Sequence, residues 1–300
     1  MNAIEIRDLT KSFRGLYAVD HLNMTVPQGA IYGFIGENGS GKSTTEKLIC
    51  GHLAKDLGTI KLFGRDHEDA GVRGRVGALI ENAGCFPSSS VYQNLRMQTI
   101  NLGLSDPDGE IARVLKIVRM EEHANLKFKS CSLGMKQRIG IAMALLGDPA
   151  LLILDEPING LDTDGMRIMR EILVDITQNY GCTVLISSHI LGELEKIATH
   201  YGIIRRGKMI AELSAKELEG RARVFISLKA ANMKGAYTSL KEKYSNVRHE
   251  EEYIRIYGSD NCEEAVKHLL KHGIVVSEIR KNKIGLEEYY TQLMSGKENI

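Results

Sequence analysis

Eight consecutive residues, Gly36–Ser43, read GENGSGKS and fit the pattern G-x-x-x-x-G-K-[ST] at every fixed position. An apolar, strand-forming run, Ala30–Ile35, leads into them, and Thr44–Cys50 has the composition of a helix. A strand, a glycine loop and a helix in this order form a cradle for phosphate groups, because the loop N–H groups and the helix N-terminus both favour an anion. The alternative is a chance glycine-rich turn.

This loop predicts a nucleoside triphosphate site. Lys42 is expected to reach the β- and γ-phosphates, and the Ser43 hydroxyl is expected to bind Mg²⁺. The residues expected to contact the nucleotide here are Gly36, Glu37, Asn38, Gly39, Ser40, Gly41, Lys42, Ser43 and Thr44.

The composition is that of an ordinary globular chain, with 43% apolar and 26% charged residues among 300. The net charge of +1 gives no overall field that would attract nucleic acid. Five scattered cysteines without a C-x-x-C pair argue against structural zinc or a disulfide framework and favour a reducing compartment. No window approaches the roughly 18 consecutive apolar residues of a membrane span, and the N-terminus lacks a signal-peptide pattern.

The order of elements predicts an α/β fold with two domains. Apolar strand-like runs alternate with helices up to residue 204, which indicates a sheet covered by helices. We expect a nucleotide-binding domain over residues 1–220, with a helical insertion at about 84–147. Residues 221–300 read β-α-β-β-α-β, from a strand at Arg223–Leu228 to one at Ile274–Ile279 and a last helix. This order predicts a small α+β accessory domain of ferredoxin-like type.

A second candidate site lies at Leu151–Leu154, an apolar strand followed directly by two carboxylates. The end of a buried strand lies at the ligand crevice of an α/β sheet. Asp155 could hold Mg²⁺ there, and Glu156 could act as the general base for an attacking water. The alternative is a pair of acids capping the next helix.

A serine and a glycine, Ser132 and Gly134, stand at the start of the apolar helix Ile139–Leu146, within the stretch SCSLGMKQR. Unpaired N–H groups at a helix start can bind a phosphate, although a plain helix cap is the simpler interpretation.

Taken together, these motifs resemble those of the ATP-binding-cassette (ABC) ATPases over about residues 4–220. GENGSGKST resembles the Walker A motif, LLILDE the Walker B motif, and CSLGMKQR the signature, with Ser132 placed 23 residues before Asp155. Gly160-Leu161-Asp162 matches the D-loop, His189 the switch histidine, and Phe13 the aromatic residue that stacks on adenine.

The resemblance implies a P-loop NTPase fold with a RecA-like core, an antiparallel β-subdomain and a helical insertion. It also implies a head-to-tail dimer that holds two ATP molecules. Ser132 and Gly134 of one subunit would contact the γ-phosphate bound by the other, and the catalytic residues would be Lys42, Glu156 and His189. ATP and Mg²⁺ are the implied ligands, and the implied metal ligands are Ser43, Glu81 and Asp155.

Three departures from the family pattern involve four residues. Leu133 and Met135 stand in the signature where glycine and glutamine are common, and Glu81 stands at the Q-loop glutamine. A carboxylate accepts hydrogen bonds but cannot donate them, unlike an amide. A surface position is the alternative for Glu81. The third departure is Glu46, an acid in the first helical turn after the loop, whose charge the helix dipole would partly offset.

The acidic residue at the Q-loop, the string SLGMKQR and the C-terminal string LEEYYTQLMSG resemble the corresponding segments in the ATPase subunits of bacitracin-resistance and lantibiotic-immunity exporters. The resemblance implies export of a peptide antibiotic, with a separate transmembrane permease and a second nucleotide-binding subunit, identical or not. It places the chain in the cytoplasm, on the inner face of the cell membrane, with no nucleic acid bound. A non-transport ABC ATPase acting on ribosomes or nucleic acid is the alternative function, and a P-loop kinase or GTPase fits the motifs less well.

The helical insertion is the expected docking face for the permease. Candidate contacts are Phe86, Pro87, Val91 and Tyr92, unless these residues form the core of the insertion.

Overall fold

The computed structural model describes residues 1–221, 224–250, 252–283 and 285–295. The chain divides into two compact units, Met1–Ala215 and Lys216–Ile300. Each unit has a hydrophobic cluster of its own.

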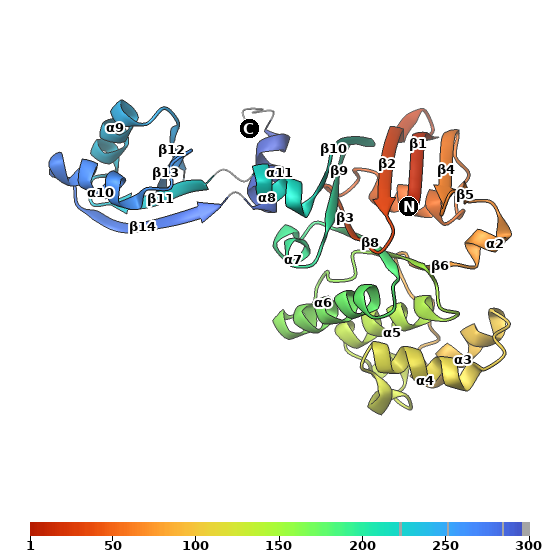
Figure 1. The fold of residues 1–300 in the computed structure, drawn as a ribbon. Helices are drawn as coiled ribbons and strands as arrows, with labels where there is room; N and C mark the ends of the chain where they lie inside the picture. Colours follow the sequence, from red (N-terminus) through yellow and green to blue (C-terminus); the bar gives the residue numbers. More distant parts are fainter. Residues whose placement is uncertain (222–223, 251, 284, 296–300) are drawn as a thin grey trace. The chain divides into compact units, whose positions relative to one another are not determined.

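A six-stranded sheet forms the centre of the first unit (Figure 1). Its order is β10-β9-β3-β8-β7-β6, and all neighbours pair in parallel except β9 and β10. Parallel strands covered on both faces read as continuous apolar runs, which is why every residue of β3 is buried. The strands are β3 (Ile31–Ile35), β6 (Val76–Leu79), β7 (Leu151–Asp155), β8 (Thr183–Ser188), β9 (His200–Arg205) and β10 (Lys208–Ser214).

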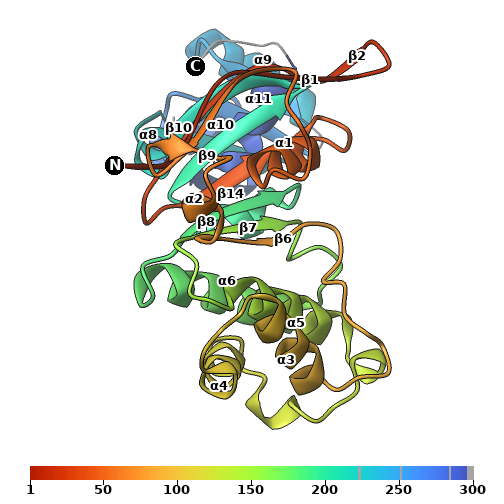
Figure 2. The same ribbon diagram turned by 90° about the vertical axis from the view of Figure 1, so that its right-hand side faces the viewer.

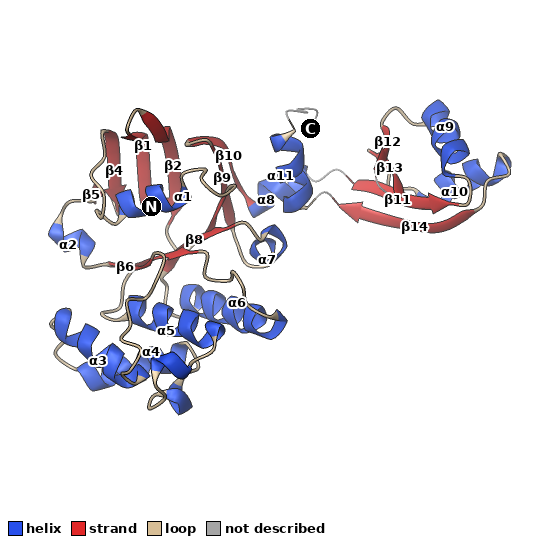
Figure 3. Ribbon diagram, turned by 180° about the vertical axis from the view of Figure 1, so that it is seen from behind, coloured by secondary structure: helices blue, strands red, loops and turns tan. Residues whose placement is uncertain are grey.

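A smaller antiparallel sheet, ordered β2-β1-β4-β5, packs with helix α1 (Lys42–Ile49) on one side of the central sheet (Figure 3). One hydrophobic cluster joins all three, with Ile4 from β1, Leu48 from α1 and Phe34 from β3 among its fully buried members. The remaining elements of this layer are β1 (Asn2–Phe13), β2 (Leu16–Pro27), β4 (Leu57–Leu62), β5 (Arg65–Asp66) and α2 (Ala70–Arg73).

The segment between β6 and β7 is helical and lies on the other side of the central sheet (Figure 2). It contains α3 (Val91–Asn101), α4 (Pro107–Ile117) and α5 (Leu133–Leu145), with short 3-10 turns between α4 and α5. Local sequence starts each helix, because Ser90, Asp106 and Ser132 accept N-cap hydrogen bonds from the first turns. The helices α6 (Thr163–Gln178) and α7 (Leu191–Glu195) complete the unit.

The second unit contains a four-stranded antiparallel sheet in the order β12-β13-β11-β14. Helices α9 and α10 cover one face of it, and Leu228 and Ile254 are buried between sheet and helices (Figure 3). The order β-α-β-β-α-β is that of a split βαβ unit. The elements are α8 (Ala215–Arg221), β11 (Val224–Ala230), α9 (Met233–Lys243), β12 (Val247–Glu250), β13 (Tyr253–Tyr257), α10 (Cys262–Lys271), β14 (Val276–Lys283) and α11 (Leu286–Met294).

The predicted fold class is confirmed: an α/β P-loop core with an antiparallel layer, a helical insertion and a small α+β second unit. Individual bounds differ. The strand expected at Ile274–Ile279 is instead Val276–Lys283, and Arg223, expected to open a strand, lies outside the described residues. None of the helices in the described part of the chain is both long enough and apolar enough for a membrane span.

Candidate nucleotide-binding site

Two glycines of the loop after β3 are required by close packing. A Cβ at Gly36 would lie 2.5 Å from Ser40 Oγ and 2.6 Å from the Ile204 carbonyl oxygen. Gly41 has a φ of 110°, and a Cβ there would lie 2.3 Å from the Ala18 carbonyl oxygen. The loop can therefore curl tightly only because these positions carry no side chain.

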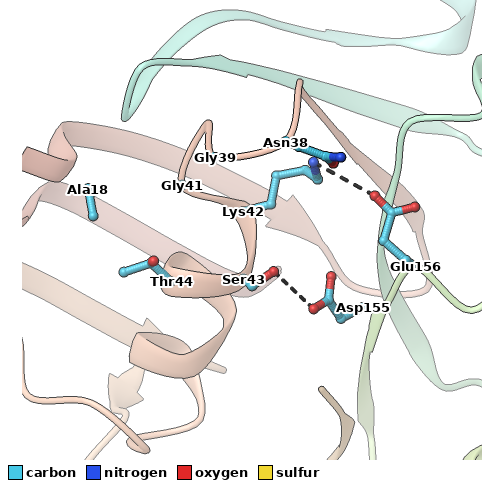
Figure 4. A pocket seen from close by; sticks show the side chains of 9 residues that line it. All are labelled: Ala18, Asn38, Gly39, Gly41, Lys42, Ser43, Thr44, Asp155 and Glu156. Atoms are coloured by element: carbon cyan, nitrogen blue, oxygen red, sulfur yellow. Dashed lines mark hydrogen bonds and ion pairs between the residues drawn. The ribbon is translucent and has the colours of Figure 1, made fainter. Parts of the chain in front are cut away.

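Lys42 lies inside the curl of this loop. Its side chain is buried, and Nζ donates to the Gly36 carbonyl at 2.6 Å and lies 3.7 Å from Glu156 Oε1 (Figure 4). Ser40 Oγ is buried with no hydrogen-bond partner among the described residues. A buried cation, an orphaned hydroxyl and a helix N-terminus at one place fit the phosphate chain of a nucleotide.

Asp155, at the end of β7, receives two hydroxyl hydrogen bonds. Ser43 Oγ donates to Oδ2 at 2.9 Å (Figure 4). Ser187 Oγ donates to Oδ1 at 2.8 Å. A carboxylate and a serine hydroxyl in contact are oxygen ligands of the kind that Mg²⁺ prefers. Ser43 and Asp155 are therefore the residues of this pocket that could hold the ion.

Glu156 is held by contacts on several sides. Its backbone has a φ of 49°, and its N–H donates to both the carbonyl and the hydroxyl of Ser187. Its Oε2 atom lies 2.8 Å from His189 Nδ1, at the end of β8. The carboxylate thus lies between Lys42 and His189, where it could accept a proton from a water at the phosphates.

The pocket brings eight of the predicted site residues together. It is a hollow of about 240 Å³ lined by Ala18, Asn38, Gly39, Gly41, Lys42, Ser43, Thr44, Asp155 and Glu156. Cavities that enclose drug-sized ligands measure roughly 300–1,000 Å³, so this one suits the phosphate end of a nucleotide rather than the whole molecule.

Phe13 lies outside this hollow, at the turn between β1 and β2, and 46% of its surface is exposed. Lys11 Nζ lies 5.5 Å from the ring centroid. The exposed aromatic ring is available for stacking with a flat base.

The structure does not bring Glu81 into the phosphate pocket. Its carboxylate contacts Lys47 Nζ of α1 at 2.5 Å, and its φ is 67°. It lines a separate hollow beside Asn82 and Cys85. The predicted metal ligand therefore lies apart from Ser43 and Asp155.

The signature residues form a further separate hollow. Ser132 Oγ accepts from the Met135 N–H at 3.2 Å, so it caps α5 as the simpler interpretation expected. Ser132 and Gly134 line this hollow with Gly160, Leu161 and Asp162. Among the described residues, it shares no lining residue with the phosphate pocket.

Glu46 is the most unusual side chain of the site. It is fully buried in α1, and neither carboxylate oxygen has a hydrogen-bond partner among the described residues. Burial, and then the negative charge of Asp155, raise the pKa of Glu46 to about 8.

Sequence reasoning assigned no role to two residues of the site, Ser187 and Lys47. Ser187 joins Asp155 to the backbone of Glu156, and Lys47 holds Glu81. The signal for Ser187 was its place near the end of a buried strand, two residues before His189, where parallel strands present their residues to one crevice.

Comparison with known proteins places the chain in a family. The ABC transporter family matches residues 19–159. A bacitracin transport ATP-binding protein of Bacillus licheniformis is 35% identical, over 98% of this chain and 97% of the relative. A lantibiotic transport ATP-binding protein of Streptococcus pyogenes is 40% identical, over 72% of this chain and 92% of the relative.

A solved structure from Clostridium perfringens, described as part of an ABC transporter complex, has a TM-score of 0.66 and 26% identity, over 72% of this chain and 90% of that one. The fold, the phosphate pocket and these relatives lead to one assignment. The chain belongs to the ABC transporter family, as an ATP-binding subunit that couples ATP hydrolysis to transport.

Proposed function

We propose that the chain binds MgATP in a composite site, formed by the phosphate pocket of one subunit and the signature hollow of another. The observation that carries the proposal is the separation of the two hollows, which share no lining residue among those described. Two separate hollows, one with the phosphate loop and one with the signature, favour a site that two chains complete together. A second copy, or a similar chain, would place Ser132 and Gly134 over the phosphates.

Each residue then has a distinct task. The loop 36–43 and Lys42 bind the phosphates, Phe13 stacks on adenine, and Ser43 and Asp155 hold Mg²⁺. The ion, when bound, offsets phosphate charge during hydrolysis. Glu156 accepts the proton of the attacking water, while His189 keeps its carboxylate oriented.

We further propose that the ATPase drives export of a peptide antibiotic through a separate transmembrane permease. The support is the similarity, over nearly the whole chain, to a bacitracin transport ATP-binding protein. Such a subunit works in the cytoplasm, against the inner face of the membrane. Within the helical insertion, Phe86 is exposed and available to the permease, whereas Val91 is fully buried and belongs to the core.

The test is purification of the tagged chain from its native membranes, followed by identification of the proteins that accompany it. A membrane-spanning chain whose bacitracin-like substrate stimulates ATP hydrolysis is the expected result. Recovery of ribosomes or nucleic acid alone would contradict the proposal. The net charge of +1 makes that outcome unexpected.

A further inference from the structure

Two leucines connect the signature turn to the loop that follows Glu156. A Cβ built at Gly160 would lie 3.1 Å from Leu133 Cδ2, and one built at Gly134 would lie 3.7 Å from Leu161 Cδ2. Each leucine therefore lies over a glycine of the opposite segment. This reciprocal contact is called the leucine pair below.

Leu133 lies between two of the hollows described above. It lines the signature hollow together with Gly160, and it also lines the hollow that contains Glu81. Half of its surface is exposed, so its side chain is not simply part of the protein core. A glycine at this position would leave Gly160 without that contact.

The loop beyond the leucine pair leads directly to the proposed general base. The Asn159 N–H donates to the Glu156 carbonyl at 3.1 Å, and the Leu161 N–H donates to the Ile158 carbonyl at 3.3 Å. These turns make residues 156–161 a short, internally bonded segment. A displacement of Gly160 is therefore passed to Glu156 through few rotatable bonds.

We infer that Leu133 is a positioning residue that couples the signature turn to Glu156 of the same chain. This inference rests on the proposed composite site, in which the signature and Glu156 of one chain serve two different ATP molecules. The leucine pair then makes occupancy at one ATP site set the position of the base at the other. Tightly packed contacts transmit such shifts because they have few alternative arrangements.

The test compares the full-length wild type with three variants. L133A removes the contact, L133M restores an apolar side chain of similar length, and L102A is a matched control, since Leu102 is 48% exposed and Leu133 is 50% exposed. Hydrogen exchange of the Asn159 and Leu161 amides reports the loop directly. The ATP dependence of hydrolysis, with its Hill coefficient, reports coupling between the sites.

In L133A we expect exchange of these amides at least about fivefold faster, a Hill coefficient reduced toward one, and a lower kcat. L133M and L102A should behave as wild type. A merely structural role of Leu133 would leave the Hill coefficient unchanged.

If the wild type turns over ATP normally but L133A shows unchanged loop exchange and unchanged cooperativity, the inference about Leu133 is overturned while the proposed function stands. A wild type that hydrolyses ATP without any cooperativity would overturn that inference as well. A wild type that neither binds nor hydrolyses ATP would overturn the proposed function together with it.

Discussion

At the scale of single residues, Glu156 is the most constrained group of the site. Its backbone has a positive φ, its N–H is bonded to Ser187, and its carboxylate lies between Lys42 and His189. A non-glycine residue with positive φ is uncommon, and such conformations are found preferentially at functional sites. The backbone thus aims the carboxylate at the phosphate pocket.

Replacing Glu156 with glutamine should leave ATP binding intact and lower kcat by about 10²–10⁴-fold, because the amide cannot accept the proton of the attacking water. Steady-state ATP hydrolysis and nucleotide titration measure the two quantities separately. Glu195→Gln is the matched control, since Glu195 is exposed in α7. Normal turnover in E156Q would remove Glu156 from the role of general base.

The buried Glu46 predicts an unusual dependence of stability on pH. Its ordinary pKa is 4.5, and its pKa in the folded chain is about 8. Between these values the unfolded chain loses a proton that the folded chain keeps, so this group makes the free energy of unfolding fall as pH rises. The loss is about 1.4 kcal/mol per pH unit at most.

Glu46→Gln removes this titration, so the variant should gain stability relative to wild type as the pH is raised from about 5 to about 8. Urea unfolding without nucleotide or magnesium, at several pH values, measures the difference. The same Glu195→Gln variant should run parallel to wild type. Parallel curves for Glu46→Gln as well would show that folding does not raise the pKa of Glu46.

At the scale of elements, the phosphate loop depends on glycine for space as much as for flexibility. Gly36→Ala would force its new Cβ against Ser40 Oγ and the Ile204 carbonyl, at a cost of about 1–3 kcal/mol in stability, and should weaken ATP binding. Thermal unfolding and ATP titration measure both. Gly192→Ala is the matched control, because a Cβ there meets nothing within 4 Å. This variant should lose neither thermal stability nor ATP affinity.

The buried strands could be predicted from sequence because a covered parallel strand needs apolar residues throughout. The strand β7, LLILD, follows this rule, and so Asp155 at its end and Glu156 just after it could be placed at the crevice. The strand β10, KMIAELS, is an edge strand in which only Leu213 is buried, so it lacks the apolar run that reveals a strand. Burial on both faces is therefore what makes a strand visible in the sequence.

The error at Ile274 has a local cause. The Ile274 N–H donates to the Leu269 carbonyl and the Gly273 N–H to the Leu270 carbonyl, while Gly273 has a φ of 68°. These bonds form a Schellman motif that ends α10, so Ile274 belongs to the helix cap. The contacts of Ser187 and Lys47 escaped prediction for another reason. They depend on which strands and helices become neighbours in the fold, which the local sequence does not determine.

At the scale of the whole molecule, the chain consists of two units, and its relatives cover different shares of its length. The lantibiotic transport relative covers 72% of the chain, whereas the bacitracin transport relative covers 98%. The first unit, Met1–Ala215, contains every residue of the proposed ATP site.

A chain ending at residue 215 should therefore fold cooperatively and bind ATP with an affinity within a few-fold of the full-length protein, because the first unit has a hydrophobic cluster of its own. Circular dichroism during heating and nucleotide titration provide the measurements. A fragment that is unfolded, or that has lost ATP binding, would show that the second unit completes the first.

The composite ATP site is the central claim for the assembled molecule. Sedimentation of the Glu156→Gln chain with and without MgATP tests it directly, because this variant should retain the nucleotide that joins two subunits. We predict a monomer without ATP and a dimer with it, and no dimer when Ser132 is also replaced by arginine. A Glu156→Gln chain that binds MgATP yet stays monomeric at every protein concentration would contradict a site built from two chains of this kind.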